Sequence, residues 1–156
     1  MRENLWRYLQ ILLLGGWLGG LTFYALVVVR VGNALLGGTQ QGFVTQQVTF
    51  WLNLLGLLVA CALLIEVWRI RLRATTITWC VFTSAQLGLC MLHVQMDRML
   101  DGPTQSIHDG DTFYRWHQSY LWVTAGQWMA GLLLLWYATT RRIATSTTGE
   151  PPSTPF

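Results

Sequence analysis

Residues 11–29 read ILLLGGWLGGLTFYALVVV and contain no charged side chain. Because an α-helix rises about 1.5 Å per residue, roughly 20 consecutive apolar residues cross the hydrocarbon layer of a bilayer. This apolar run is longer than the core of a secretory signal peptide, and no small-x-small cleavage site precedes Arg30. We therefore expect an uncleaved helix that spans a membrane.

Three further stretches have the same apolar character, and each is long enough to cross a bilayer once. The sequence thus predicts an all-α integral membrane protein, a four-helix bundle in up-down-up-down order with helices at residues 6–30, 46–68, 75–97 and 113–140. Composition agrees, since 53% of the 156 residues are hydrophobic and 11% charged, more apolar surface than a soluble domain of this length buries. Nine Trp and five Tyr suit the aromatic belts at membrane interfaces.

The ten basic residues are all Arg and fall at the ends of the predicted helices. Seven lie at the N-terminus, between the second and third helices and after the fourth, whereas three lie on the opposite side together with four Asp. The positive-inside rule then predicts that both termini are cytoplasmic, in a multi-pass protein of the plasma (inner) membrane. Residues 1–143 form the membrane domain, and residues 144–156, rich in Thr, Ser and Pro, are expected to be a disordered cytoplasmic tail.

Small and polar residues in the first two predicted helices indicate helix packing. Glycines spaced by four residues let two helix backbones approach closely in lipid, and the first helix carries two such pairs, formed by Gly15, Gly16, Gly19 and Gly20. Asn53 lies within the second helix and is expected to find a hydrogen-bond partner across a helix interface.

The third and fourth predicted helices each carry a polar face. On the third helix the residues at helical spacing are Thr83, Gln86, Cys90, His93 and Asp97. On the fourth they are His117, Tyr120, Thr124 and Gln127. Because one loop joins the two helices, they run antiparallel. Aligning the two His residues sets Gln86 opposite Thr124, so polar groups face each other at matching depths.

Three hypotheses explain this polar seam. Interhelical hydrogen bonding alone would keep the side chains away from lipid. Alternatively, His93 and His117 could ligate haem or a copper or zinc ion, with His108 in the external loop as a further donor. The third hypothesis is a polar conduit or substrate pocket, since ionisable groups at membrane depth often mark pathways.

No cofactor and no catalytic residue is predicted, because the sequence has no recognisable Ser-His-Asp or Cys-His signature. We interpret the chain as a non-enzymatic structural, interaction or transport-associated component, with the haem- or metal-binding redox role of His93 and His117 as the alternative. Its expected partners are the lipid bilayer and a further copy of itself or another membrane protein. A net charge of +3, spread over helix ends, argues against nucleic acid.

Three stretches covering about half of the chain resemble one family. GGWLGGLTFYALVVV is similar to its Trp/Gly-rich first helix, GGTQQGFVTQQVTFWLNLLGLL to its short loop and second helix, and FYRWHQSYLWVTAGQWMAGLLLL to its last helix. This family comprises the small four-span membrane proteins grouped as domain of unknown function 4149, which include transmembrane protein 205. His117 stands where the family has a His at the head of the last helix.

The chain resembles a divergent member of that family. Arg30 stands where the family has Pro, and residues 118–120 are Gln-Ser-Tyr in place of small residues. The resemblance implies the four-span fold and assigns no activity.

Overall fold

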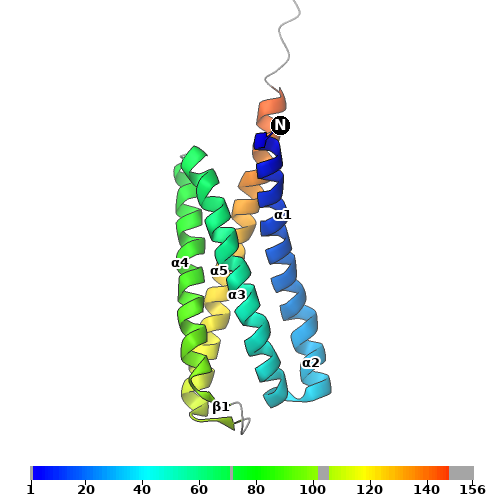
Figure 1. Ribbon diagram of the computed structural model, residues 1–156, viewed down its shortest axis with the longest axis vertical. Helices are drawn as coiled ribbons and strands as arrows, with labels where there is room; N and C mark the ends of the chain where they lie inside the picture. The colour runs from blue at the N-terminus through cyan, green and yellow to red at the C-terminus, as the bar shows by residue number, and fades with distance from the viewer. Residues whose placement is uncertain (1, 71, 102–105, 148–156) are drawn as a thin grey trace, which may run out of the picture.

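The computed structural model describes residues 2–70, 72–101 and 106–147, with side chains in 5–38, 40–69, 72–101 and 106–140. It is 92% helical and has 4 helices, which lie side by side along their lengths (Figure 1). The first consists of α1 (Arg2–Phe23), the π-helical turn η1 (Tyr24–Val28) and α2 (Val29–Leu36). The others are α3 (Gly38–Ile70), α4 (Arg73–Asp97) and α5 (Gly110–Thr147).

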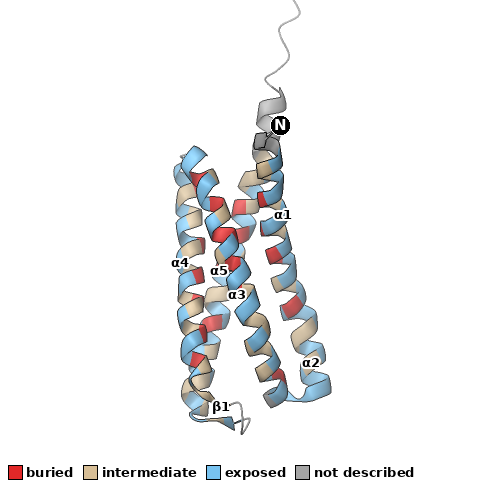
Figure 2. Ribbon diagram, in the orientation of Figure 1, coloured by how far each residue is buried: buried red, intermediate tan, exposed pale blue. Residues whose placement is uncertain are grey.

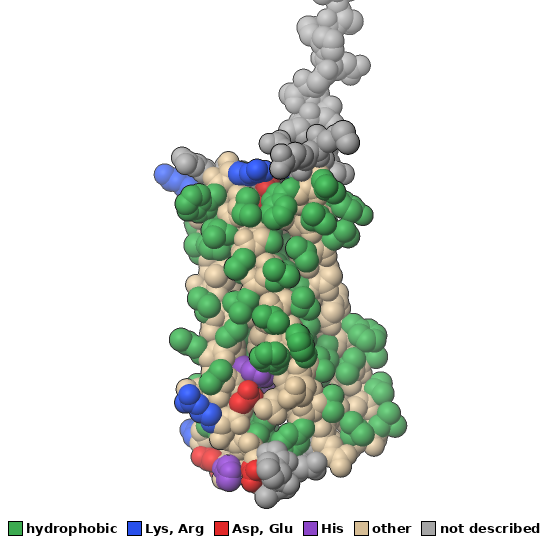
Figure 3. All heavy atoms as spheres, in the orientation of Figure 1, with side chains coloured by type: hydrophobic (Ala, Val, Ile, Leu, Met, Phe, Trp, Pro, Cys, Tyr) green, Lys and Arg blue, Asp and Glu red, His purple; other side chains and the backbone are tan. Residues whose placement is uncertain are grey.

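Three of the helical segments are long and apolar enough to cross a membrane: Leu5–Leu36, Gln40–Arg69 and Arg73–Asp97. Hydrophobic side chains cover the middle of the molecule and the charged side chains in view lie near its two ends (Figure 3). Trp68 and Trp122 are 77% and 71% exposed, as expected of side chains that face lipid. The predicted all-α fold is confirmed, and three of its helices have the length and apolar character of membrane spans.

The first two long helices are joined much more tightly than the sequence suggests. Residues 32–46 are polar and Gly-rich, and the predicted helices stop on either side of them, yet α2 continues to Leu36 and α3 begins at Gly38. Gly37 lies between them with φ of 79° and ψ of 163°, a conformation that a side chain strongly disfavours. Hydropathy identifies only the apolar part of a helix. Backbone hydrogen bonds of a helix also form between polar residues, so both helices extend beyond their apolar stretches.

Three side chains join pairs of helices by donating hydrogen bonds to backbone carbonyls. The Trp17 indole donates to the carbonyl of Leu52 at 3.1 Å, and Trp79 donates to that of Ala60 at 2.9 Å. At the other side of the first helix, Arg7 donates to Ala138 O at 2.8 Å. A helical carbonyl has a second lone pair, so these bonds add contacts between helices without breaking the helical ladder.

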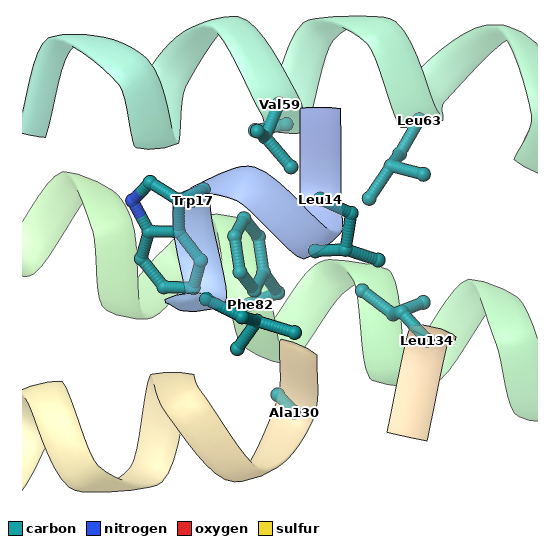
Figure 4. Close-up of a cluster of buried hydrophobic side chains, with 9 residues drawn as sticks. Leu14, Trp17, Val59, Leu63, Phe82, Ala130 and Leu134 are labelled. Carbon is teal, nitrogen blue, oxygen red and sulfur yellow. The ribbon is translucent and has the colours of Figure 1, made fainter. Parts of the chain in front are cut away.

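The apolar core lies where α1, α3, α4 and α5 meet (Figure 4). The Trp17 and Phe82 rings pack edge to face with centroids 5.2 Å apart. Around them lie Leu14, Leu18, Val59, Ala60, Leu63, Ala130 and Leu134. Buried residues lie on the inward faces of the helices (Figure 2). Because lipid is as apolar as these side chains, close packing and not transfer from water holds the core together.

A short hairpin connects α4 to α5. Strands β1 (Leu100–Asp101) and β2 (Ser106–Ile107) pair antiparallel, and residues 102–105 between them lie outside the described residues. Asp109 then caps α5, because its Oδ1 accepts the Thr112 N–H at 3.1 Å. Hydrogen bonds from Thr112 hold the pKa of the Asp109 carboxyl below its usual range.

The far end of α5 reaches into the predicted tail. Residues 144–147 are helical, while the rest of that segment, residues 148–156, lies outside the described residues.

Candidate functional site

A network of buried amides links α3, α4 and α5 at the level of Gln86. Gln86 is 0% exposed and Gln127 1%. Gln127 donates from Nε2 to Gln86 Oε1 at 2.7 Å, and Gln86 Nε2 donates to the carbonyl of Asn53 at 3.2 Å. Tyr120 donates from its hydroxyl to Asn53 Oδ1 at 3.3 Å. Four of the polar residues singled out by sequence therefore meet in one place.

Gly56 creates the space for this network. A Cβ atom at Gly56 would overlap Gln86 Oε1 and come within 3.1 Å of Trp17 Nε1. Two side chains from α1 and α4 thus enter the groove that the missing methyl group leaves on α3. Close approach of this kind is what small residues permit between helices in lipid.

Some buried polar atoms in and beside the network have no hydrogen-bond partner among the described residues. These are Asn53 Nδ2, Gln127 Oε1 and Thr83 Oγ1. An amide in the membrane interior gains by finding partners for all its donors and acceptors. The junction of α3, α4 and α5 is therefore polar beyond what its own hydrogen bonds satisfy.

The register of α4 against α5 differs from the expected one by about a turn of helix. Gln86 pairs with Gln127 and not with Thr124. Thr124 donates to the carbonyl of Tyr120 in its own helix at 2.8 Å. Cys90 Sγ lies 3.6 Å from Gln86 Nε2, at the edge of the network.

His93 and Asp97 lie beyond the network, towards the hairpin end, and face α3. His93 Nε2 lies 3.4 Å from Asp97 Oδ2, and His93 Nδ1 lies 3.5 Å from the Thr49 hydroxyl. Gln46 donates from Nε2 to Asp97 Oδ1 at 2.9 Å. A cleft of about 220 Å³ opens there, which we call the outer cleft, lined by Gln46, Gln47, Phe50, His93 and Asp97.

The three histidines do not converge in the structure. His117 stacks on Phe113, one turn earlier in α5, with ring centroids 6.2 Å apart and planes at 7°. His93 faces α3 instead, and His108 is exposed in the connection before α5. Among the side chains that the structure describes, no group of three or more His, Cys, Asp or Glu could hold a metal ion.

The four glycines predicted to pack the first helix make no close contact with another helix. A Cβ atom at Gly15, Gly16 or Gly19 would meet nothing within 4 Å, and one at Gly20 would lie 3.9 Å from Leu52 Cδ2. The close contacts are made at other glycines. A Cβ at Gly131 would lie 3.1 Å from Leu18 Cδ2, so spacing alone did not reveal which glycines lie between helices.

Sequence reasoning did not single out Gln46, Gln47 and Phe50. All three lie where the second predicted helix begins, in a stretch that hydropathy assigns to its margin. An antiparallel alignment of α3 with α4 would have found them. Since Asn53 meets Gln86 and Ala60 meets Trp79, the same register sets Gln46 opposite His93, one helical turn before Asp97, to which Gln46 donates.

Comparison of the chain with protein-family models, with curated proteins and with solved structures finds no match.

Proposed function

We propose that the chain is a multi-pass membrane protein whose four helices form an up-down-up-down bundle, with α5 as the fourth span. In this proposal it is a non-enzymatic structural, interaction or transport-associated component. The carrying observation is the amide network: Gln86, Gln127 and Asn53 direct their hydrogen bonds to one another across three helices. Amides used in this way stabilise a particular packing of spans.

Charge at the two ends supports the orientation within this proposal. Arg7 and Arg69 lie at the end where the first helix begins, and Arg30 and Arg98 lie towards the opposite end. Counted over the whole sequence, Arg favours the first of these ends, so both termini are proposed to be cytoplasmic in a plasma (inner) membrane. The hairpin end, with the outer cleft, then faces the exterior.

The resemblance to the four-span family fits this proposal. Its strongest local feature is His117 with Phe113 at the head of the last helix, where the two rings stack. We propose that the chain is a divergent member of that family.

Replacement of Gln127 by Leu tests the role of the network. This change removes the donor of the 2.7 Å bond and leaves Gln86 Oε1 buried without it, so we expect a loss of about 1 kcal/mol in unfolding free energy. Gln118→Leu, at an exposed position of the same helix, is the matched control. Equal stability of the two variants in detergent unfolding would count against a packing role.

Cysteine labelling tests the orientation. In a variant without Cys61, Cys80 and Cys90, a membrane-impermeant maleimide is expected to label cysteine placed at His108 in intact cells. Cysteine placed at Arg69 is expected to react only after permeabilisation. The opposite pattern would reverse the orientation and place the outer cleft in the cytoplasm.

A further inference from the structure

We propose that the outer cleft binds a small organic ammonium group, held between the Asp97 carboxylate and the ring of Phe50. The cleft lies between α3 and α4, at the end of α4 where the chain turns into the hairpin. Figure 3 shows a His and an acidic side chain adjoining one another towards this end of the molecule. This inference goes beyond the packing role of the amide network and does not depend on it.

Side chains of the cleft hold the Asp97 carboxylate in place. Gln46 donates to Oδ1 at 2.9 Å, and Oδ2 lies 3.4 Å from His93 Nε2. These contacts orient the group, yet its side chain remains 36% exposed. Gln46 is uncharged, and none of the five lining residues is Lys or Arg. A carboxylate near membrane depth is stabilised by a cation, which this cleft leaves room for.

Phe50 contributes an aromatic ring to the lining. Phe50 is 50% exposed, and its centroid lies 6.3 Å from that of His93 with the rings inclined at 37°. Trp51 packs edge to face against Phe50, with centroids 5.5 Å apart, which restricts the ring. A cation within about 6 Å of a ring face is attracted to it. Phe50 and Asp97 together therefore favour a cation with an apolar coat.

The size and chemistry of the cleft narrow the ligand further. Its volume of about 220 Å³ is below the roughly 300–1,000 Å³ of pockets for drug-sized molecules. A hard metal ion prefers six or more oxygen ligands, and a phenyl ring supplies none. An anion would be repelled by the Asp97 carboxylate. An ammonium carrying a few methyl or methylene groups fits on each count.

Two sources could supply such a group. Asp97 is the last residue of α4, and Arg98 and Asp101 follow it, so the cleft lies where this helix leaves the apolar layer. A dissolved amine and the ammonium headgroup of a lipid both reach that level. Their shared chemistry is the substituted ammonium.

Calorimetric titration of the full chain in phosphatidylglycerol nanodiscs tests the proposal. The ligands are choline and its uncharged analogue, in which carbon replaces the quaternary nitrogen. We expect saturable binding of choline and at least about tenfold weaker binding of the analogue. Asp97→Asn, which keeps the acceptor for Gln46, is expected to weaken choline binding by about tenfold or more. Asp111→Asn, at an exposed position of the same end, is the matched control and leaves it unchanged.

Phe50→Leu gives a second test that leaves the buried polar residues in place. It is expected to weaken choline binding by about three- to tenfold, with an unchanged far-UV circular dichroism melt. Equal binding of choline and its analogue, wild-type affinity in Asp97→Asn, or no saturable binding in phosphatidylglycerol would overturn the proposal. Repeating the titration in phosphatidylcholine separates the sources: weaker choline binding there assigns the cleft to a lipid headgroup, and equal binding assigns it to a dissolved amine.

Discussion

Replacement of Gly56 by Ala adds a methyl group where Gln86 Oε1 lies. The amide must leave its position, because Trp17 Nε1, 3.1 Å from the new carbon, closes the other side. Gln86 then loses the bond from Gln127 at 2.7 Å and its own bonds to Asn53 O and Oδ1 at 3.2 and 3.4 Å. One methyl group therefore disrupts the whole junction of α3, α4 and α5.

The magnitude follows from those three bonds. A hydrogen bond between spans contributes about 0.6 kcal/mol on average and about 1.7 at most. Loss of all three costs about 2 kcal/mol, to which the displacement of Trp17 adds. Ala favours a helix over Gly by about 1 kcal/mol, which offsets part of the cost. We expect Gly56→Ala to lower the unfolding free energy by about 1–3 kcal/mol.

Gly16→Ala is the matched control, since a Cβ there meets nothing within 4 Å. It makes the same chemical change in a helix and is expected to be neutral or stabilising by up to about 1 kcal/mol. The assay is denaturant unfolding in mixed micelles followed by far-UV circular dichroism. Equal stability of the two variants would refute the reasoning. In a Gln86→Ala background the cost of Gly56→Ala is expected to fall to that of displacing Trp17, because the blocking oxygen is gone.

Three further predictions use the same unfolding assay. Gly37→Ala forces a side chain into φ of 79° and is expected to cost about 1–3 kcal/mol, whereas Gly38→Ala, in open space, is expected to cost nothing; similar values would contradict the strained link. Trp79→Phe loses the 2.9 Å bond to Ala60 O and is expected to cost about 0.5–1 kcal/mol. Trp136→Phe, at an exposed position, is expected to change nothing, and equal effects of the two would show that the bond does not stabilise the fold. Asp109 has a lowered pKa, so its contribution to the unfolding free energy is present above the ordinary carboxyl pKa and is lost as pH falls through the lowered value. Asp109→Asn is expected to reduce the loss of stability at acid pH. An unchanged loss in the variant would assign it to other groups.

The composition and the long stretches without charged residues predicted a helical membrane protein, and residues 11–29 alone indicate one. The ends of the helices could not be predicted in the same way. Residues 32–46 are too polar to mark a span, yet they continue both helices to within one residue of each other. Hydropathy measures the preference of side chains for lipid and not the ability of the backbone to form a helix. Gln and Thr can be helical outside the apolar layer, so the two helices here continue up to a single glycine.

The polar site was predicted in its members but not in its register. Gln86, Gln127, Asn53 and Tyr120 were singled out, and they do meet. The sequence alignment placed Gln86 against Thr124 because it assumed that His93 and His117 lie at one depth. That depends on how the hairpin between α4 and α5 is built and on the angle at which the helices cross, neither of which residue spacing records. Likewise, the glycine pattern of the first helix is the same for a face that meets lipid and for one that meets another helix.

The link at Gly37 bears on how the chain is made. In the proposed bundle, the first two spans are joined through this one residue, without a loop that would let them insert one after the other. During synthesis the segment up to Leu36 and the segment from Gly38 are therefore expected to leave the translocon together, as a preformed hairpin. The first apolar run is then expected to stay outside the lipid until Asn53 and the residues around it have left the ribosome.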